Sequence, residues 1–245
     1  MTRHPDQPSS PLVAVVGSFN VDHVWRCESL PAPGATLGGE YLSGPGGKGF
    51  NQAVAASRAG AATAFVCALG DDLGGHHARQ LAADEGIDLR AQSADVPTGS
   101  AGIFVDAQGR NSIVVGPGAN ATLSADFITR HETLLAGTRV VLAQLETPPE
   151  AAVAAFARTR AAGGLAVLNP APANAQVSAE LLAQADILTP NETECAALFR
   201  RLGERLDGEA IASLDSQRLH ALCRDLLPGG TVVVTLGAAG CFVSH

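Results

Sequence analysis

Short apolar segments rich in β-branched residues alternate along this chain with alanine-rich segments whose apolar residues recur at helical spacing. Such an alternation is typical of βαβ units around a mostly parallel sheet. The pattern predicts strands over residues 12–16, 63–69, 140–145, 165–168, 186–188 and 231–235. It predicts helices over residues 51–59, 75–84, 125–135, 149–161, 192–201 and 216–226. With helices on both faces, the expected fold is a doubly wound α/β sheet.

Two segments, residues 23–43 and 98–115, break this rhythm. Both alternate polar and apolar residues, both contain glycines, and the second has a hairpin-like turn, AQGRN, from Ala107. These features are typical of short strands joined by tight turns. We therefore expect a single α/β domain over residues 1–245, with the two segments inserted as a small β lid that folds over the main sheet.

Polar side chains follow the ends of several predicted strands. Asn20 and Asp22 come after the first strand, Glu146 comes after the strand over 140–145, and Asn191 comes after the strand over 186–188. In open α/β sheets, ligands bind outside the carboxyl ends of the strands. These side chains would therefore line one rim of the sheet, although ordinary turns and caps explain part of the set.

The charge balance and the cysteines narrow the class of protein. The chain has 24 acidic and 16 basic residues and a net charge of −8, which disfavours nucleic acid as a partner. Five scattered cysteines form no CxxC pair, and we interpret them as reduced thiols of a cytoplasmic protein. The first residues contain no apolar signal segment, and no apolar run approaches the length of a membrane span, so export and membrane insertion are not expected.

The only lysine of the chain, Lys48, lies in the glycine cluster GPGGKG, whereas the other 15 basic residues are arginines. Glycines before a helix let backbone N–H groups and the positive end of the helix dipole face an oxygen-rich ligand. The cluster is not a Walker A loop, because Gly49 follows Lys48. A flexible lid hinge explains the same glycines, and a single lysine can occur by chance, so these interpretations stay open.

The polar rim suits hydroxyl groups. Asn20, Asp22 and Glu146 offer amide and carboxylate oxygens, and one carboxylate accepts hydrogen bonds from two hydroxyls at once. This favours a sugar or another polyol as the ligand. A turn that starts at Asp22 is an equally good explanation of that stretch alone.

Two further motifs have both a structural and a ligand-binding interpretation. In TPNETE, Asn191 and Glu194 have the spacing of a capping box, which the spacing alone favours. A second interpretation is that Glu194 orients water around Mg²⁺ near a nucleotide phosphate. TLGAAG, from Thr235 to Gly240, suits a nucleotide or a plain β-turn. Nothing in the order of residues indicates a hydrolase triad, and no GxGxxG of a Rossmann dehydrogenase follows the first strand.

Eight motifs across nearly the whole chain resemble, in the same order, those of the ribokinase family of carbohydrate kinases, the PfkB group. They are GSFNVDH from Gly17, GPGGKGFNQAVAASRAGA from Gly44, GDDLGG from Gly70, GPGANA from Gly116, QLETP from Gln144, NPAPA from Asn169, TPNETE from Thr189 and TLGAAG from Thr235. Eight ordered matches make chance improbable, although no single motif is decisive.

The resemblance implies transfer of the γ-phosphoryl group of ATP to the 5-hydroxyl of D-ribose, assisted by Mg²⁺ and stimulated by a monovalent cation such as K⁺. It also implies a homodimer that forms through the lid. The residues that would bind ribose are Asn20, Asp22, Gly46, Gly47, Lys48, Gly49, Asn51 and Glu146. The residues that would line ATP are Asn191, Thr235, Gly237, Ala238 and Gly240, and Glu194 would act on Mg²⁺ through water.

The chain also departs from the family pattern. Phe50 stands where the family usually has a small residue, so we expect an altered fit around the sugar loop. A DTxGAGD-like motif, whose last Asp is the family's general base, does not occur in residues 1–245. We therefore expect the base and the monovalent-cation ligands beyond His245, and little or no activity from these residues alone, with losses on the order of 10² or more in rate from each missing effect.

Without the strands and helices that the family carries beyond this point, apolar surface should be exposed, so we expect poor solubility or poor folding. Two alternative functions stay open. The chain could be another sugar or nucleoside kinase of the same fold, or a non-catalytic sugar-binding module.

Overall fold

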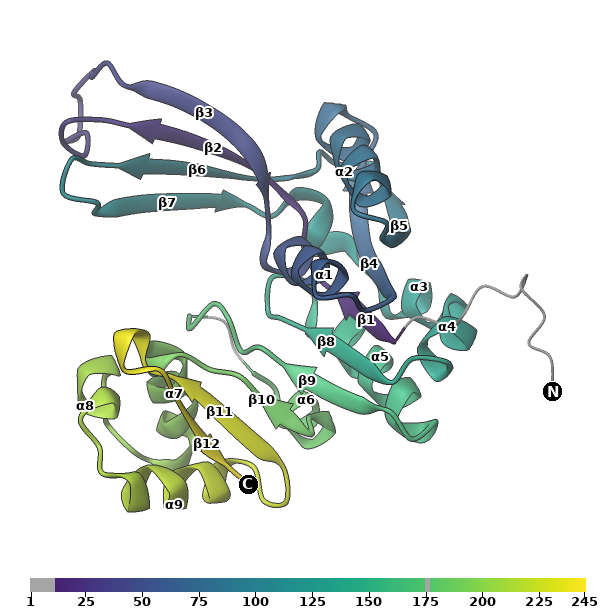
Figure 1. Cartoon of the computed structure of the whole chain (residues 1–245). Helices are drawn as coiled ribbons and strands as arrows, with labels where there is room; N and C mark the ends of the chain where they lie inside the picture. Colours follow the sequence, from purple (N-terminus) through teal and green to yellow (C-terminus); the bar gives the residue numbers. More distant parts are fainter. Residues whose placement is uncertain (1–11, 175–176) are drawn as a thin grey trace.

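The computed structural model describes residues 12–174 and 177–245, which form two sheets (Figure 1). The main sheet has eight strands in the order β12-β11-β10-β9-β8-β1-β4-β5. All neighbours are parallel except β11 and β12. The strands are β1 (Val13–Val16), β4 (Thr63–Gly70), β5 (Asp88–Ala94), β8 (Val140–Ala143), β9 (Leu165–Leu168), β10 (Ile187–Leu188), β11 (Thr231–Thr235) and β12 (Cys241–Ser244).

Helices connect the strands and cover both faces of the main sheet (Figure 1). The α-helices are α1 (Lys48–Arg58), α2 (Leu73–Asp84), α3 (Ala125–Arg130), α4 (Glu132–Ala136), α5 (Pro149–Ala161), α6 (Ala179–Gln184), α7 (Glu192–Phe199), α8 (Gly208–Ala212) and α9 (Ser216–Leu226). Short 3₁₀ helices are η1 (Gly118–Thr122), η2 (Arg200–Leu202) and η3 (Gly237–Ala239). No helix within the described ranges has the length and apolar character needed to cross a lipid bilayer.

The wholly apolar strands are explained by burial on two faces. Successive side chains of a strand point to opposite faces, so Ala14 and Val66 enter one core while Val15 and Phe65 enter the other. The first core contains side chains of α3, α5, α6, α7 and α9, and the second contains side chains of α1 and α2. The predicted doubly wound α/β sheet is confirmed.

The structure corrects several predicted bounds. The helix expected over 125–135 is two helices that break at His131, where φ is −105° and ψ is 23°. The helix expected over 192–201 ends at Phe199, and the strand expected over 140–145 ends at Ala143. The sequence pattern missed α6, α8, β5 and β12. Strand β5 was missed because it lies at a sheet edge and has polar, partly exposed residues instead of an apolar run.

The second sheet contains β2 (Asn20–Arg26), β3 (Glu40–Gly46), β6 (Gly99–Val105) and β7 (Asn111–Gly116), in the order β3-β2-β6-β7. It projects from the main sheet in Figure 1. Its strands extend beyond the predicted segments 23–43 and 98–115, because β2 begins at Asn20 and β3 ends at Gly46. Asn20 and Asp22 therefore lie on a strand of the second sheet and not in a loop after the first strand.

Candidate functional site

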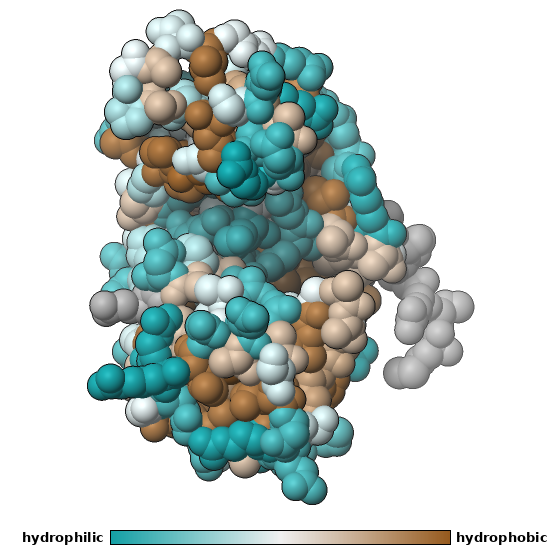
Figure 2. All heavy atoms as spheres, turned by 90° about the vertical axis from the view of Figure 1, so that its left-hand side faces the viewer, coloured by the Kyte–Doolittle hydropathy of each residue, from teal (hydrophilic) through white to brown (hydrophobic). Residues whose placement is uncertain are grey.

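The order of strands marks one place on the main sheet where a crevice is expected. The chain passes from β1 to β4 and β5 on one side, and later from β8 to β9, β10 and β11 on the other side. Neighbouring strands β1 and β8 therefore form the topological switch point, where open α/β sheets bind ligands at the carboxyl ends. Gly17 and Ser18 follow β1, and Gln144 and Glu146 follow β8. Figure 2 shows a recessed band of hydrophilic surface between the second sheet and the rest of the chain.

The carboxylate of Glu146 joins three segments at this point. Its Oε2 accepts a hydrogen bond from Ser18 Oγ at 2.5 Å and from the backbone N–H of Lys48 at 3.0 Å. Lys48 is the first residue of α1, and the N-cap residue Gly47 has no side chain that could accept from the free N–H groups. Glu146 therefore acts as the acceptor at the start of α1, where a negative charge is also stabilised by the helix dipole.

The glycines of the GPGGKG segment have a packing reason. A Cβ on Gly47 would lie 2.8 Å from the carbonyl oxygen of Ser18, and a Cβ on Gly49 would lie 2.5 Å from the Ser18 nitrogen. Gly47 also has φ 90° and ψ 131°, a conformation that side chains disfavour. The GPGGKG segment therefore packs directly against the residues after β1, with no space for a side chain at Gly47 or Gly49.

Asn20 and Asp22 stand on one face of the second sheet, because they are two residues apart on β2. Asn20 lies between Gly46 of β3 and Gly99 of β6, and Asp22 lies between Gly44 and Ala101. A Cβ on Gly46 would lie 2.3 Å from the carboxylate of Asp22. The carboxylate of Asp22 thus packs directly over Gly46, and the glycines beside Asn20 and Asp22 let these two side chains lie close to the neighbouring backbone.

Asp22 and Glu146 influence each other electrostatically. Burial raises the pKa of Asp22 above its ordinary value of 3.8, the charge of Glu146 raises this pKa further, and His23 opposes the shift. Glu146 already accepts from the hydroxyl of Ser18, and hydroxyl groups of a ligand are further donors that suit two neighbouring carboxylates. The structure brings together Asp22, the GPGGKG segment and Glu146, because Gly46 contacts the Asp22 carboxylate and the Lys48 N–H donates to Glu146.

The other predicted sugar residues lie at the same end of α1. Asn51 is in the first turn of α1 and is exposed, and its backbone N–H donates to Gly47 O at 3.0 Å. Phe50 is 3% exposed and packs edge-on against Phe19 at a centroid distance of 5.1 Å. The Phe50 ring points into the core beneath α1, and the altered fit of the sugar loop stays a prediction.

The predicted nucleotide residues form a second group, at the carboxyl ends of β10 and β11. Asn191 Oδ1 accepts from the Glu194 N–H at 2.8 Å, and Glu194 Oε2 accepts from the Asn191 N–H at 2.9 Å. The capping box at the start of α7 is confirmed. Asn191 forms a β-bridge with Thr235, and the Thr235 N–H donates to Pro190 O at 2.9 Å.

The loop after β11 is a tight, exposed turn. It contains η3, and the Leu236 N–H donates to Gly240 O at 2.8 Å. Gly237 and Gly240 have φ of 50° and 94°, so both positions favour glycine. Ala238 is exposed between them. The turn therefore presents backbone on the same rim of the main sheet as Glu146.

A chain of side-chain amides runs from the end of β8 through α1 to the end of β10. Gln144 donates to Gln52 Oε1, Gln52 Nε2 donates to Asn169 Oδ1 at 3.2 Å, and Asn169 Nδ2 donates to Thr189 O at 2.9 Å. Sequence reasoning missed the roles of Gln52 and Asn169, and of Ser18 beside Glu146. All three lie inside motifs that had been singled out, so their place in the sequence was the available signal.

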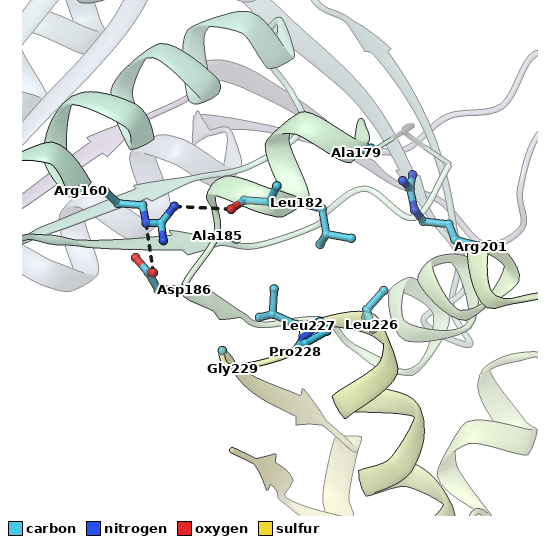
Figure 3. Close-up of a pocket in the computed structure, with 12 residues that line it drawn as sticks. Arg160, Ala179, Leu182, Ala185, Asp186, Arg201, Leu226, Leu227, Pro228 and Gly229 are labelled. Carbon is cyan, nitrogen blue, oxygen red and sulfur yellow. Dashed lines mark hydrogen bonds and ion pairs between the residues drawn. The ribbon is translucent and has the colours of Figure 1, made fainter.

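The cavities around the main sheet do not add another candidate binding site of equal weight. The cavity in Figure 3, of about 420 Å³, is lined by Asp186 and Gly230, which precede β10 and β11. It therefore lies at the amino ends of these strands, opposite to the carboxyl ends where Glu146 lies. Arg160 and Asp186 pair there at 3.1 Å. A second cavity of about 430 Å³ adjoins Asn174 and the predicted nucleotide residue Glu194. Within the described residues, no three His, Cys, Asp or Glu side chains form a group that could hold a metal.

Comparison with known proteins gives consistent matches. Residues 10–245 match the family described as pfkB family carbohydrate kinase. The chain is 41% identical to a ribokinase of Haemophilus influenzae over 95% of this chain and 74% of that protein. It is 35% identical to a ribokinase of Mus musculus over 94% of this chain and 70% of that protein.

Solved structures agree with these matches. A ribokinase structure from Giardia lamblia is similar with a TM-score of 0.85 and 29% identity, over 96% of this chain and 72% of that one. A structure of Arabidopsis thaliana ribokinase complexed with ribose and ATP has a TM-score of 0.78 and 30% identity, over 96% of this chain and 75% of that one.

Proposed function

The chain belongs to the pfkB family of carbohydrate kinases, and we propose that it acts in the transfer of the γ-phosphoryl group of ATP to the 5-hydroxyl of D-ribose. The observation that carries this proposal is the meeting of Asp22, the Lys48 segment and Glu146 at the switch point between β1 and β8. Curated relatives named ribokinase, and a relative's structure with ribose and ATP, support ribose as the sugar and ATP as the donor.

On the sugar side, Asp22 accepts hydrogen bonds from ribose hydroxyls, and Asn20 contacts the same sugar from the neighbouring position on β2. The backbone of Gly46, Gly47 and Gly49, together with Lys48 and Asn51, encloses the sugar from the start of α1. Glu146 Oε2 is engaged by Ser18 and Lys48, which leaves Oε1 for a hydroxyl. Holding the acceptor rigidly in this way is the main contribution of a protein to phosphoryl transfer.

On the nucleotide side, ATP lies along Asn191 and the turn after β11, with backbone contacts from Thr235, Gly237, Ala238 and Gly240. Glu194 fits an indirect role toward Mg²⁺, because only its Oε2 is used by the capping box and Mg²⁺ keeps most of its waters. When bound, Mg²⁺ would neutralise charge on the phosphates. Stimulation by K⁺ is a further part of the proposal, for which we assign no ligand among the described residues.

We also propose a homodimer that forms through the second sheet. Val24, Leu42, Ile103, Ile113 and Val115 share the face that carries Asp22. Leu42, Ile113 and Val115 are 42%, 50% and 50% exposed. A second copy that covers this aliphatic face would remove apolar area from water. A cytoplasmic location completes the proposal, and five free cysteines agree with it.

The proposal is tested by titration calorimetry of the purified protein with ribose, deoxyribose, fructose and adenosine. Asp22→Ala is the test variant, and Asp126→Ala is the matched control, because Asp126 is an exposed carboxylate on α3. Ribose should bind most tightly, Asp22→Ala should weaken it at least tenfold, and Asp126→Ala should leave it unchanged. Tighter binding of another compound of the panel would replace ribose as the acceptor.

Phosphoryl transfer is followed in the same samples with Mg²⁺ and ATP by ³¹P NMR. A phosphate on the 5-position couples to two protons and gives a triplet, whereas a phosphate on the 1-position gives a doublet. We propose no residue of this chain as the general base, so transfer is expected to be slow relative to a kinase that carries one. A doublet in place of the triplet would refute the 5-hydroxyl as the acceptor.

A further inference from the structure

The side chain of Asn120 clamps the start of the second sheet. Asn120 lies in η1, directly after β7, and is 1% exposed. Its Oδ1 accepts from the Phe19 N–H at 3.0 Å, and its Nδ2 donates to Phe19 O at 3.0 Å. The same Nδ2 donates to Asn20 Oδ1 at 2.8 Å. One buried amide therefore holds both the backbone and the side chain at the start of β2.

Backbone polarity fixes the orientation of both side-chain amides. The Phe19 N–H is a donor, so the atom of Asn120 that faces it must be the oxygen, and the Phe19 carbonyl is an acceptor, so the atom that faces it must be the nitrogen. The second hydrogen of that nitrogen points to Asn20 and requires an acceptor there. The carbonyl oxygen of Asn20 is consequently turned toward Asn120, and its NH₂ group is turned away.

Gly99 makes this meeting of amides feasible. It is the register partner of Asn20 on β6. A Cβ at this position would lie 2.2 Å from Asn120 Nδ2 and 2.4 Å from Asn20 Oδ1. Three segments that are far apart in the sequence thus converge on one hydrogen bond. Asn20 is 4% exposed, and within the described ranges its side chain has no other hydrogen bond.

We propose that Asn120 is a positioning residue that presents Asn20 to the sugar as a hydrogen-bond donor. This inference rests on the proposed function and deepens it. The face of β2 then offers the sugar a donor at Asn20 and an acceptor at Asp22, two residues along the strand. A hydroxyl oxygen accepts from the first side chain, and a hydroxyl group donates to the second. The site would select for sugars with hydroxyls at both places.

A double-mutant cycle with Asn120→Asp and Asn20→Ala tests the route of action, with ribose affinity measured by calorimetry. Asn120→Asp keeps an acceptor for the Phe19 N–H but loses the donor that faces Asn20. The side chain of Asn20 then turns over, so that its NH₂ faces the new carboxylate and its oxygen faces the sugar. We expect about tenfold weaker ribose binding in the parent chain, the scale of one hydrogen bond to a ligand. In the Asn20→Ala background the same change should weaken binding less than about twofold.

The control variant is Asn111→Asp, which adds the same charge at an exposed position of the second sheet. It should leave ribose binding unchanged. Thermal melts of all variants establish that each is folded. An equal loss from Asn120→Asp in both backgrounds would show that Asn120 merely holds the backbone of Phe19, and would overturn the proposal.

A measurement without ligand separates this inference from the proposed function. In a chain labelled with ¹⁵N-asparagine, the side-chain NH₂ signals are assigned from their loss in Asn20→Asp and Asn120→Asp. The protons of Asn120 should exchange slowly with solvent, and those of Asn20 should exchange faster than those of Asn120 until ribose is added. Exchange at Asn20 as slow as at Asn120 in the free protein would overturn the orientation. Faster exchange at Asn20 together with no ribose binding would overturn the proposed function and the sugar contact while the orientation stands.

Discussion

Comparing alanine variants of the two glycines that flank α1 isolates the loss of stability caused by a clash between an added Cβ and the backbone. Gly47 precedes the helix with φ 90°, and Gly60 follows it with φ 89°. A Cβ on Gly47 would meet Ser18 O at 2.8 Å, and Asn20 N and Phe19 Cα at 2.9 Å, whereas a Cβ on Gly60 would meet nothing within 4 Å. Replacing either glycine by alanine places a side chain at positive φ, but only Gly47→Ala adds a clash with neighbouring backbone.

The expected loss of stability follows from two contributions, the side chain at positive φ and the clash with backbone. A side chain at positive φ costs about 1–2 kcal/mol, which applies to both variants. Forcing a methyl group into a packed site costs a further 1–3 kcal/mol, roughly, which applies only to Gly47→Ala. We therefore expect Gly47→Ala to be less stable than Gly60→Ala by about 2 kcal/mol, or roughly 4–8 °C in Tm for a chain of this size.

Denaturant unfolding monitored by circular dichroism measures the difference, and calorimetry with ribose gives a second readout. Gly47→Ala should also weaken ribose binding, because it moves the Lys48 N–H away from Glu146, while Gly60→Ala should not. Stabilities of the two variants that agree within about 0.5 kcal/mol, the scatter of neutral surface changes, would refute close approach as the reason for Gly47.

Three further predictions follow. The raised pKa of Asp22 means that the folded state binds this proton more tightly than the unfolded state, so stability falls as pH rises from 3.8 through the raised value. In thermal scans, Asp22→Asn should therefore have a higher Tm than the parent at pH 7 and the same Tm below pH 3.8. The same variant should lose ribose affinity. Glu194→Gln should keep the capping box and its stability but weaken Mg²⁺-dependent ATP binding, whereas Glu194→Ala should also lose about 1 kcal/mol on urea unfolding. Cys241 is exposed, but burial raises the pKa of the Cys67 thiol to about 12, so a thiol reagent at pH 8 should label Cys241 rapidly and Cys67 only after unfolding, as peptide mapping would reveal.

Features that depend on residues close together in the chain could be predicted from the amino-acid order. The strand predicted over residues 63–69, observed as Thr63–Gly70, was evident because an unbroken apolar run indicates burial on both faces. The capping box of Asn191 and Glu194 was evident because both partners lie within one helical turn. Polar residues after apolar strands indicated a functional rim, since parallel strands place their carboxyl ends on one edge.

Contacts that depend on strand register and strand order could be found only in the folded chain. Glu146 and Lys48 are 98 positions apart in the sequence, and Asn120 and Asn20 are 100 positions apart. No local pattern specifies that these groups meet, because their contact requires β8 beside β1 and β6 beside β2. The same dependence explains why Asn20 belongs to the second sheet and why Phe50 points into the core. A hydrogen bond between distant segments forms only once the sheets have fixed which residues face each other.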